Sequence, residues 1–287
     1  MSLPLKIVSA YLRVLRKPPY ASEERFRAVL AAPKGDPSPP RTMRVEQRTI
    51  AGRPCYVVEP RHDRVRAGTI VYLHGGSYVH EIADEHWRLV ARLADEVACT
   101  VHVPIYGLAP FSGWRAAHAF LDAVWGGVQG RSLLMGDSAG GGLALAFAIS
   151  LIRRARPLPA GLVLIAPWLD ATLSNPEIAA VEAIDPWLAR PGLVAAGRAW
   201  AMGDDAKRWE VSPIYAADED VARLPPTTAF IGTHDILHPD VVALGRRAPN
   251  VTVIEAPGLM HVYPLVPIPE GRAGEAEVIA KAKRLLS

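Results

Sequence analysis

Apolar and polar residues follow two different patterns in the segments that resemble β-strands. Over residues 43–60 they alternate, in "MRVEQRTI" and "PCYVVEP", which is typical of an antiparallel hairpin with one face in water. Later segments are apolar on both faces and have the length of buried strands. These segments are residues 69–74, 99–105, 132–136, 161–167, 227–232 and 250–256.

Helical periodicity fills the intervals between these strands. Apolar residues recur three and four positions apart in residues 84–97, 114–125, 139–155 and 238–248, and residues 273–286 form a last helix. Fully apolar strands that alternate with helices indicate a parallel sheet covered on both faces. We therefore expect an α/β fold with a mostly parallel central sheet of about eight strands and an antiparallel start.

Two segments do not follow this alternation. Residues 1–40 precede the hairpin, and an insertion at about 175–215, rich in Pro and Trp, interrupts the main domain of residues 41–287. The first segment begins with "LPLKIVSAYLRVLRK", where apolar residues repeat at helical spacing: Leu5, Val8, Leu12 and Leu15. Such a helix could lie on a membrane surface or over a ligand, and we favour a packed helix with a solvated basic face.

Composition narrows the class of protein. Hydrophobic residues make up 50% of the chain and charged residues 21%, which is enough apolar material for a large core. The net charge is only +3 and the basic residues are scattered, so we expect no nucleic-acid partner. No apolar run reaches the roughly 18 residues of a membrane span, and the first segment is a poor signal peptide. Two cysteines, Cys55 and Cys99, are expected as buried free thiols, so the predicted location is the cytoplasm.

A serine stands between glycines in "GDSAGG", directly after an apolar strand and before a helix. This G-x-S-x-G pattern is the nucleophile elbow, in which Ser138 sits on a sharp turn that raises its hydroxyl above the sheet. Gly136 and Gly140 fit the pattern because a Cβ at either position would strike the neighbouring strand or helix. We predict Ser138 as a nucleophile; a glycine-rich packing turn is the structural alternative.

A second glycine motif, "HGGS", follows the strand at residues 69–74. Main-chain N–H groups of such a loop can bind the negative charge that develops on a substrate oxygen. The predicted oxyanion hole is formed by Gly75, Gly76, Ser77 and Ala139. His74 is expected to hold the loop, and Asp137 to fix the elbow.

A serine nucleophile needs a base and, in turn, an acid that orients the base. His261 follows the last strand, and Asp235 follows the strand before it, which gives the order Ser, Asp, His of α/β-hydrolases. Asp240 is the alternative acid, although it could instead cap the next helix. Structural or solvent-exposed roles are expected for the remaining early histidines: His62, His80, His86, His102 and His118.

Two further histidines, His234 and His238, flank Asp235. The sequence around them has no further acid or cysteine at a convincing ligand spacing, so we expect neither a metal ion nor a cofactor.

From about residue 68 onward the chain resembles the hormone-sensitive-lipase-like esterases of the α/β-hydrolase fold, also called bacterial lipase family IV. The motifs that carry the resemblance are "HGGS", "GDSAGG", "APWLD", "SPIYA", "GTHDIL" and "GLMH". The chain departs from the family in having Ser77 where a third glycine is usual, and "YGLAPF" where "YRLAPE" is usual, so that Gly107 and Phe111 replace an arginine and an acid.

The resemblance implies a helical cap made of residues 1–40 and the insertion at about 175–215. Four apolar residues of that insertion are candidates to line a substrate pocket, with core packing as the equal alternative: Trp187, Leu188, Trp200 and Met202. The leading interpretation is a serine carboxylesterase that cleaves small to medium acyl esters through an acyl-enzyme, with a small-molecule ester as its partner. Amidase or peptidase activity, and a non-catalytic receptor on the same fold, are the alternatives; a homodimer is open.

Overall fold

The computed structural model describes residues 2–41, 43–61 and 68–287. Their strands form one eight-stranded sheet in the order β1-β2-β4-β3-β5-β6-β7-β8. The strands are β1 Val45–Ile50, β2 Arg53–Val58, β3 Thr69–Leu73, β4 Thr100–Pro104, β5 Ser132–Asp137, β6 Gly161–Ile165, β7 Thr227–Gly232 and β8 Val251–Ala256. β2 pairs antiparallel with both β1 and β4, and every later pair is parallel. The predicted α/β class and the antiparallel start are confirmed.

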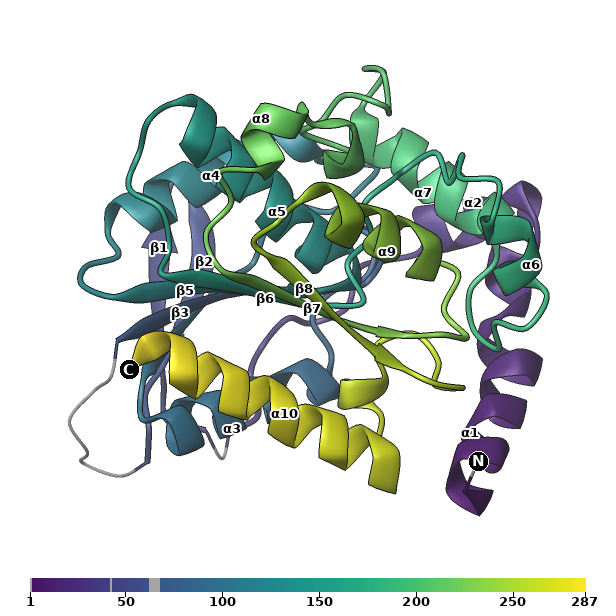
Figure 1. The fold of residues 1–287 in the computed structure, drawn as a ribbon, viewed down its shortest axis with the longest axis horizontal. Coiled ribbons are helices and arrows are strands. Elements are labelled where there is room, and N and C mark those ends of the chain that lie inside the picture. The colour runs from purple at the N-terminus through teal and green to yellow at the C-terminus, as the bar shows by residue number, and fades with distance from the viewer. Residues whose placement is uncertain (1, 42, 62–67) are drawn as a thin grey trace.

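Helices cover both faces of this sheet (Figure 1). They are α3 Asp84–Val97, α4 Trp114–Gly126, α5 Ser138–Arg153, α8 Asp218–Val221, α9 His238–Arg247 and α10 Pro269–Leu286. α3 and α10 lie on one face, and α4, α5 and α9 lie on the other. α5 is apolar around its whole circumference and is buried from Ser138 to Ile152, as expected of a helix in the centre of a large core.

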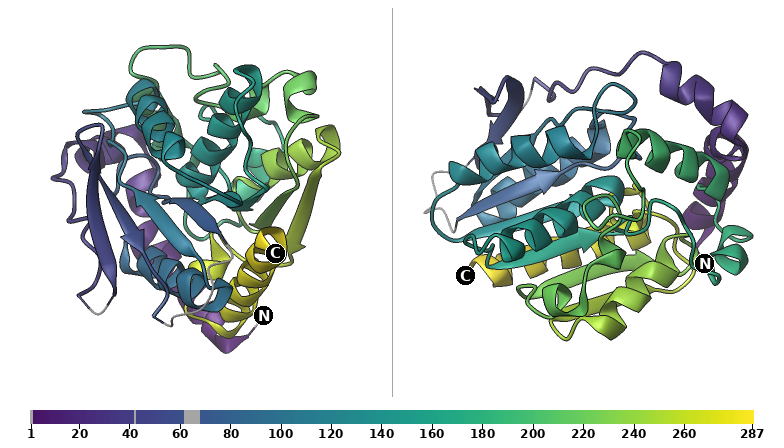
Figure 2. Two further views of the ribbon diagram at one scale, coloured as in Figure 1. Left: turned by 90° about the vertical axis from the view of Figure 1, so that its left-hand side faces the viewer. Right: turned by 90° about the horizontal axis from the view of Figure 1, so that it is seen from above.

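The N-terminal segment and the insertion pack against each other beside the sheet (Figures 1 and 2). The N-terminal segment contains α1 Leu3–Tyr11, a π-helical turn Leu12–Arg16, a 3-10 turn Pro18–Tyr20 and α2 Glu23–Ala31. The insertion contains α6 Ile178–Glu182, α7 Arg190–Ala201 and a 3-10 turn Pro213–Tyr215. The two segments meet so closely that a Cβ on Gly192 would lie 2.6 Å from the Cα of Tyr20. Lys17 also donates hydrogen bonds to the carbonyl oxygens of Glu182 and Asp185.

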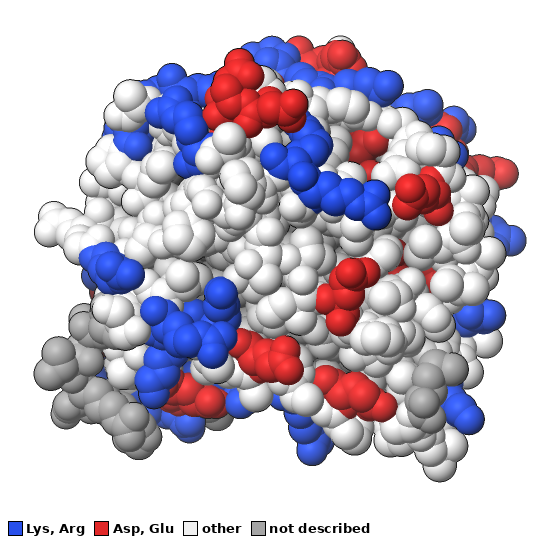
Figure 3. All heavy atoms as spheres, viewed as in Figure 1, with Lys and Arg blue, Asp and Glu red and all other residues white. Residues whose placement is uncertain are grey.

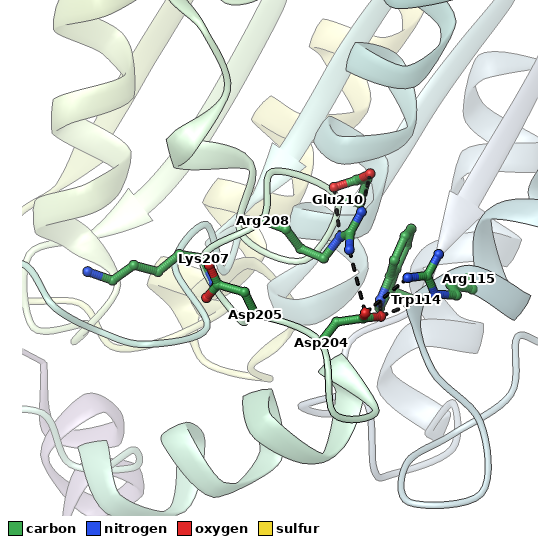
Figure 4. A network of polar contacts seen from close by, with 7 residues as sticks. All are labelled: Trp114, Arg115, Asp204, Asp205, Lys207, Arg208 and Glu210. Carbon is green, nitrogen blue, oxygen red and sulfur yellow. Dashed lines mark hydrogen bonds and ion pairs between the residues drawn. The ribbon is translucent and has the colours of Figure 1, made fainter.

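A polar cluster connects the loop after α7 to the start of α4 (Figure 4). Asp204 accepts hydrogen bonds from the indole N–H of Trp114, at 2.9 Å, and from the guanidinium of Arg115. The guanidinium carbons of Arg115 and Arg208 lie 4.3 and 4.1 Å from the Trp114 ring centroid. The indole therefore combines a hydrogen bond with two cation–π contacts.

Both cysteines are buried free thiols, Cys55 in β2 and Cys99 one residue before β4. Burial raises the pKa of each thiol to about 12, so neither is poised for thiolate chemistry. Among the helices of the described residues, none has the length and apolar content needed to cross a bilayer.

Candidate active site

Ser138 occupies a strained turn between β5 and α5. Its φ is +49°, in the left-handed region that a side chain rarely adopts. Close packing explains the flanking glycines: a Cβ on Gly140 would lie 2.1 Å from the carbonyl oxygen of Leu73, and one on Gly136 would lie 2.5 Å from that of Gly140. The turn has the geometry of a nucleophile elbow.

A hydrogen-bonded chain of three buried side chains starts at this serine. The Nε2 atom of His261 lies 2.9 Å from Ser138 Oγ, and its Nδ1 atom lies 2.8 Å from Asp235 Oδ2. The other oxygen of Asp235 accepts the main-chain N–H of Leu237 at 3.0 Å, which fixes the carboxylate. The alternative acid, Asp240, lies in the first turn of α9 and accepts a hydrogen bond from Asn175.

The electrostatic setting of His261 favours its protonated form. Burial alone would lower the pKa of the imidazole, but the negative charge and hydrogen bond of Asp235 hold it above the usual value. The carboxylate of Asp185 acts in the same direction. A ring with this bias accepts a proton from Ser138 more readily than a free imidazole does.

The HGGS loop passes directly over the elbow. Tyr106 donates a hydrogen bond to the carbonyl oxygen of His74 at 2.6 Å, and the two rings stack at 4.5 Å. The Nδ1 atom of His74 lies 2.7 Å from the carbonyl oxygen of Gly75. Burial lowers the pKa of His74 to about 4, so the ring is neutral and is part of the support of the loop.

The structure corrects one member of the predicted oxyanion hole. The N–H of Gly75 donates to Asp137 Oδ1 at 2.9 Å, so it is already committed to a carboxylate. The N–H groups of Gly76 and Ser77 follow it in the loop, and that of Ala139 lies in the first turn of α5, where helix N–H groups lack intrahelical acceptors. Gly75 therefore positions the loop, and the other three remain candidate donors.

Sequence reasoning missed a partner of Asp137. Ala83 donates its N–H to Nδ1 of His86 at 2.9 Å, so the proton of a neutral ring is on Nε2, which lies 3.2 Å from Asp137 Oδ2. Tyr72 donates to the other oxygen of the carboxylate at 2.7 Å. Asp137 thus connects strand β3, the HGGS loop and helix α3 beneath the elbow. No motif in the sequence associates His86 with Asp137.

Ser77 makes a contact that a glycine could not make. Its Oγ lies 3.1 Å from the hydroxyl of Tyr20, and both residues are buried. The N-terminal segment is therefore hydrogen-bonded to the loop that carries the candidate oxyanion donors.

A cavity of about 700 Å³ opens above these groups. Ser138, His261, Gly76 and Ser77 are among the residues that line it, as are Trp187 and Leu188 of the insertion. The Trp187 ring lies edge-on to His261, with centroids 5.7 Å apart.

The other two residues predicted to line the pocket lie elsewhere, so their assignment to the pocket was wrong. Trp200 is 1% exposed and stacks on Tyr78, with ring centroids 4.1 Å apart, so it belongs to the core. Met202 ends α7 and is 54% exposed. Neither is among the described residues that line the cavity. The sequence held no signal that separates core from pocket at these positions.

Asp185 is a further buried carboxylate. It lies beside the loop that carries Asp235, and no sequence motif had indicated it. It accepts hydrogen bonds from the main-chain N–H groups of Trp187, at 2.7 Å, Leu188, at 2.9 Å, and Ile236, at 2.8 Å. Burial and the nearby Asp235 raise the pKa of Asp185 to about 6. Asp185 therefore fixes the main chain of the cavity wall at Trp187 and Leu188, and also that of Ile236, the residue after Asp235.

Of the two histidines around Asp235, His238 has a side-chain partner and His234 is held through its main chain. His238 contacts Glu255 at 2.6 Å, and the main-chain N–H of His234 donates to the carbonyl oxygen of Leu259. Within the described parts of the chain, His, Cys, Asp and Glu side chains form no group of three or more that could hold a metal ion. His62, expected in a polar turn, lies outside the described residues.

Comparison with known proteins assigns the chain to a family. The model of the alpha/beta hydrolase fold matches residues 70–265, which include the elbow, the HGGS loop, Asp235 and His261. The chain belongs to the α/β-hydrolase family. Two relatives of this hydrolase are an acetyl-hydrolase of Streptomyces hygroscopicus, 33% identical over 76% of each chain, and an esterase of Acinetobacter venetianus, 28% identical over 71% of each.

Solved structures agree with this assignment. The crystal structure of EstE5 soaked with p-nitrophenyl butyrate has a TM-score of 0.84 and 25% identity, and covers 100% of the hydrolase and 99% of EstE5. An esterase from the bacterial hormone-sensitive lipase family shares the fold, with a TM-score of 0.83, 24% identity and coverage of 100% and 99%. The family match confirms the predicted α/β-hydrolase fold, and the fold of the esterase from the hormone-sensitive lipase family agrees with the predicted resemblance.

Proposed function

We propose that this α/β-hydrolase is a serine carboxylesterase that hydrolyses esters of small to medium acyl groups. The observation that carries the proposal is the chain of hydrogen bonds from Ser138 through His261 to Asp235, at the wall of a cavity that also contains Gly76 and Ser77. The relatives named acetyl-hydrolase and esterase support an ester substrate, and the former supports a short acyl group.

In the proposed reaction His261 Nε2 takes the proton of Ser138 as Oγ attacks the ester carbonyl carbon. The carbonyl oxygen becomes an oxyanion, to which the N–H groups of Gly76, Ser77 and Ala139 donate. A single donor of this kind is typically worth about 3–4 kcal/mol in the transition state. The C–O bond to the alcohol breaks, the alcohol oxygen receives the proton from His261, and the acyl group remains on Ser138.

Hydrolysis of this acyl-enzyme repeats the same steps with water. His261 removes a proton from the water, the resulting hydroxide attacks the acyl carbon, and Ser138 Oγ recovers the proton as the acid leaves. Asp235 keeps the Nδ1 proton of His261 in place and stabilises the imidazolium of both half-reactions.

We propose further that residues 1–40 and the insertion at about 175–215 cap the site, and that Trp187 and Leu188 limit the acyl or alcohol group. Three kinds of contact support a cap: the packing of Gly192 on Tyr20, the hydrogen bonds of Lys17, and the cavity residues that both segments supply.

The test is hydrolysis of p-nitrophenyl acetate, butyrate and longer esters, with the matching p-nitroanilides to measure amidase activity. Turnover of the short esters is expected, and Ser138→Ala should remove it, leaving at most about one part in 10⁴ to 10⁶. A serine-directed organophosphonate should add mass to the Ser138 peptide, and His261→Ala should abolish the labelling. Absence of turnover at every acyl length in a folded protein would leave the receptor interpretation.

A further inference from the structure

The outer face of α1 and the π-helical turn after it carries large apolar side chains that are more than half exposed. The exposed fractions are 70% for Leu3, 60% for Ile7, 53% for Tyr11, 67% for Val14 and 58% for Leu15. Residues four apart lie on one face of a helix, as Leu3, Ile7 and Tyr11 do. Of the predicted packing stripe, Leu5 and Leu12 are 1% and 5% exposed and Val8 is half-buried, whereas Leu15 lies on the exposed face. α1 is therefore apolar on two faces and packed on only one.

Every charged side chain within the segment that carries this face is positive, and Glu270 of α10 accepts the main-chain N–H of Ser2 at its start. Residues 1–22 contain four basic residues and no acidic one: Lys6, Arg13, Arg16 and Lys17. Lys6 and Arg13 are exposed, although Arg13 also donates a hydrogen bond to the carbonyl oxygen of Ile184 in the insertion, at 3.3 Å, and Lys17 is engaged with the same insertion. Figure 3 shows blue spheres of Lys and Arg at the right-hand edge, where α1 lies in Figure 1.

The same segment forms a wall of the cavity above Ser138. Val8, Tyr11, Leu12 and Leu15 all line that cavity. Tyr11 and Leu15 are also more than half exposed, at 53% and 58%. Tyr11 and Leu15 therefore belong both to the cavity wall and to the exposed face.

We propose that this face, defined by Leu3, Ile7, Tyr11, Val14 and Leu15 with Lys6 and Arg13 beside it, docks on an anionic lipid surface. Exposed apolar side chains flanked by basic ones are the combination by which a helix lies in the interface of a bilayer. A single exposed apolar residue is ordinary on a protein, but a contiguous group marks an interaction site.

Charge favours lipid over a second copy of the chain as the occupant. A symmetric dimer through this face would bring two segments with four positive charges each against one another, without an acid in either to compensate. Anionic headgroups supply the missing negative charge. Docking would also place the cavity, through Tyr11 and Leu15, next to the lipid.

Sedimentation with large unilamellar vesicles tests the proposal, using phosphatidylcholine with and without phosphatidylglycerol. The wild-type protein should pellet with the anionic vesicles and dissociate at high salt. Two variants should each bind at least about tenfold more weakly: Leu3→Ser/Ile7→Ser/Val14→Ser, which removes apolar area, and Lys6→Glu/Arg13→Glu, which reverses charge. Matched controls on other surfaces, Phe111→Ser and Arg246→Glu/Lys283→Glu, should bind like the wild type.

Hydrolysis of soluble p-nitrophenyl butyrate by the same samples separates docking from folding and from the proposed function. The five substituted residues do not line the cavity, so the variants should retain the wild-type rate. If no sample hydrolyses the ester, the proposed function fails and the vesicle result still decides the docking. The docking proposal is wrong if the wild type stays in solution with anionic vesicles, or if the apolar variant binds like the wild type. A wild-type dimer that this variant converts to a monomer would assign the face to self-association instead.

Discussion

At the scale of single residues, the site depends on side chains that hold main chain in place. Asp137 fixes the HGGS loop through the N–H of Gly75, and the hydroxyl of Ser77 is hydrogen-bonded to that of Tyr20. His261 is held between Asp235 and Ser138. The residues that carry out the proposed reaction are therefore distinct from those that hold the main chain in place. Each set leads to its own testable prediction.

The raised pKa of His261 predicts the acid limb of the pH profile. Only the neutral imidazole accepts a proton, so kcat/KM should rise with pH and level off above the pKa of His261, with a midpoint above the ordinary value of about 6.5. Asp235→Asn removes the charge that raises this pKa, so the midpoint should move to lower pH and the plateau should fall roughly 10³ to 10⁴-fold. An unchanged midpoint in Asp235→Asn would contradict this account.

The hydrogen bond between Tyr20 and Ser77 predicts a coupling between the N-terminal segment and the rate. Tyr20→Phe and Ser77→Ala each remove one partner, and each should lower kcat several-fold with little change in KM. Because both remove the same bond, the double variant should lose little more transition-state energy than the larger of the two single losses. Losses that add fully would mean that the two hydroxyls act independently.

At the scale of elements, α4 is attached to the insertion through Trp114, which predicts a measurable contribution to stability. Trp114→Phe removes the donor to Asp204 and weakens the contacts with Arg115 and Arg208, so the free energy of unfolding in urea should fall by about 1–2 kcal/mol.

Trp125→Phe is the matched control for this prediction, because Trp125 lies in the same helix and donates its indole N–H to the carbonyl oxygen of Pro157. The loss in Trp114→Phe should exceed that in the control and should shrink at high salt, which screens the guanidinium charges. Equal losses with equal salt dependence would refute a role for the arginines.

The elements themselves could largely be predicted from sequence, for a physical reason. A strand buried on both faces must be apolar throughout. The segments "GLVLIAP" and "TTAFIG" can therefore be recognised as strands without knowing which strands pair with them. Serine is a favoured helix N-cap, and the side chain of Ser22 accepts the N–H of Arg25 at the start of α2. Local chemistry also led to Ser138, Asp235 and His261, because an elbow and the loops after late strands have fixed places in the chain order.

What sequence could not provide is information that arises only in three dimensions. His86 and Asp137 come from distant segments and meet only through packing. Trp200 and Trp187 are the same residue type in one insertion, yet one stacks in the core and the other faces the cavity. The outer apolar stripe of α1 is ambiguous in sequence, since burial alone distinguishes it from the stripe of Leu5 and Leu12.

At the scale of the whole molecule, the buried carboxylate of Asp240 predicts how stability depends on pH. Asp240 is buried, and this raises its pKa from 3.8 to about 6. Between these values the folded state binds more protons than the unfolded state, so the free energy of unfolding falls as the pH rises, by up to about 3 kcal/mol.

Asp240→Asn has no proton to lose, so its stability relative to the wild type should increase from pH 5 to pH 8. Urea unfolding at several pH values measures the difference, and Asp185, whose pKa is also about 6, contributes equally to both proteins. A difference that stays constant over this range would show that Asp240 titrates normally.

The bonding of Asp185 has a consequence for how this enzyme scaffold can diversify. Its carboxylate accepts hydrogen bonds from the main-chain N–H groups of Trp187, Leu188 and Ile236, and these bonds do not involve their side chains. A replacement at position 188 therefore leaves the anchorage intact while it reshapes the chamber that a substrate must enter. Substrate selectivity can therefore change while the residues that transfer protons keep their positions. A library randomised at position 188 should contain many active variants with altered substrate preferences.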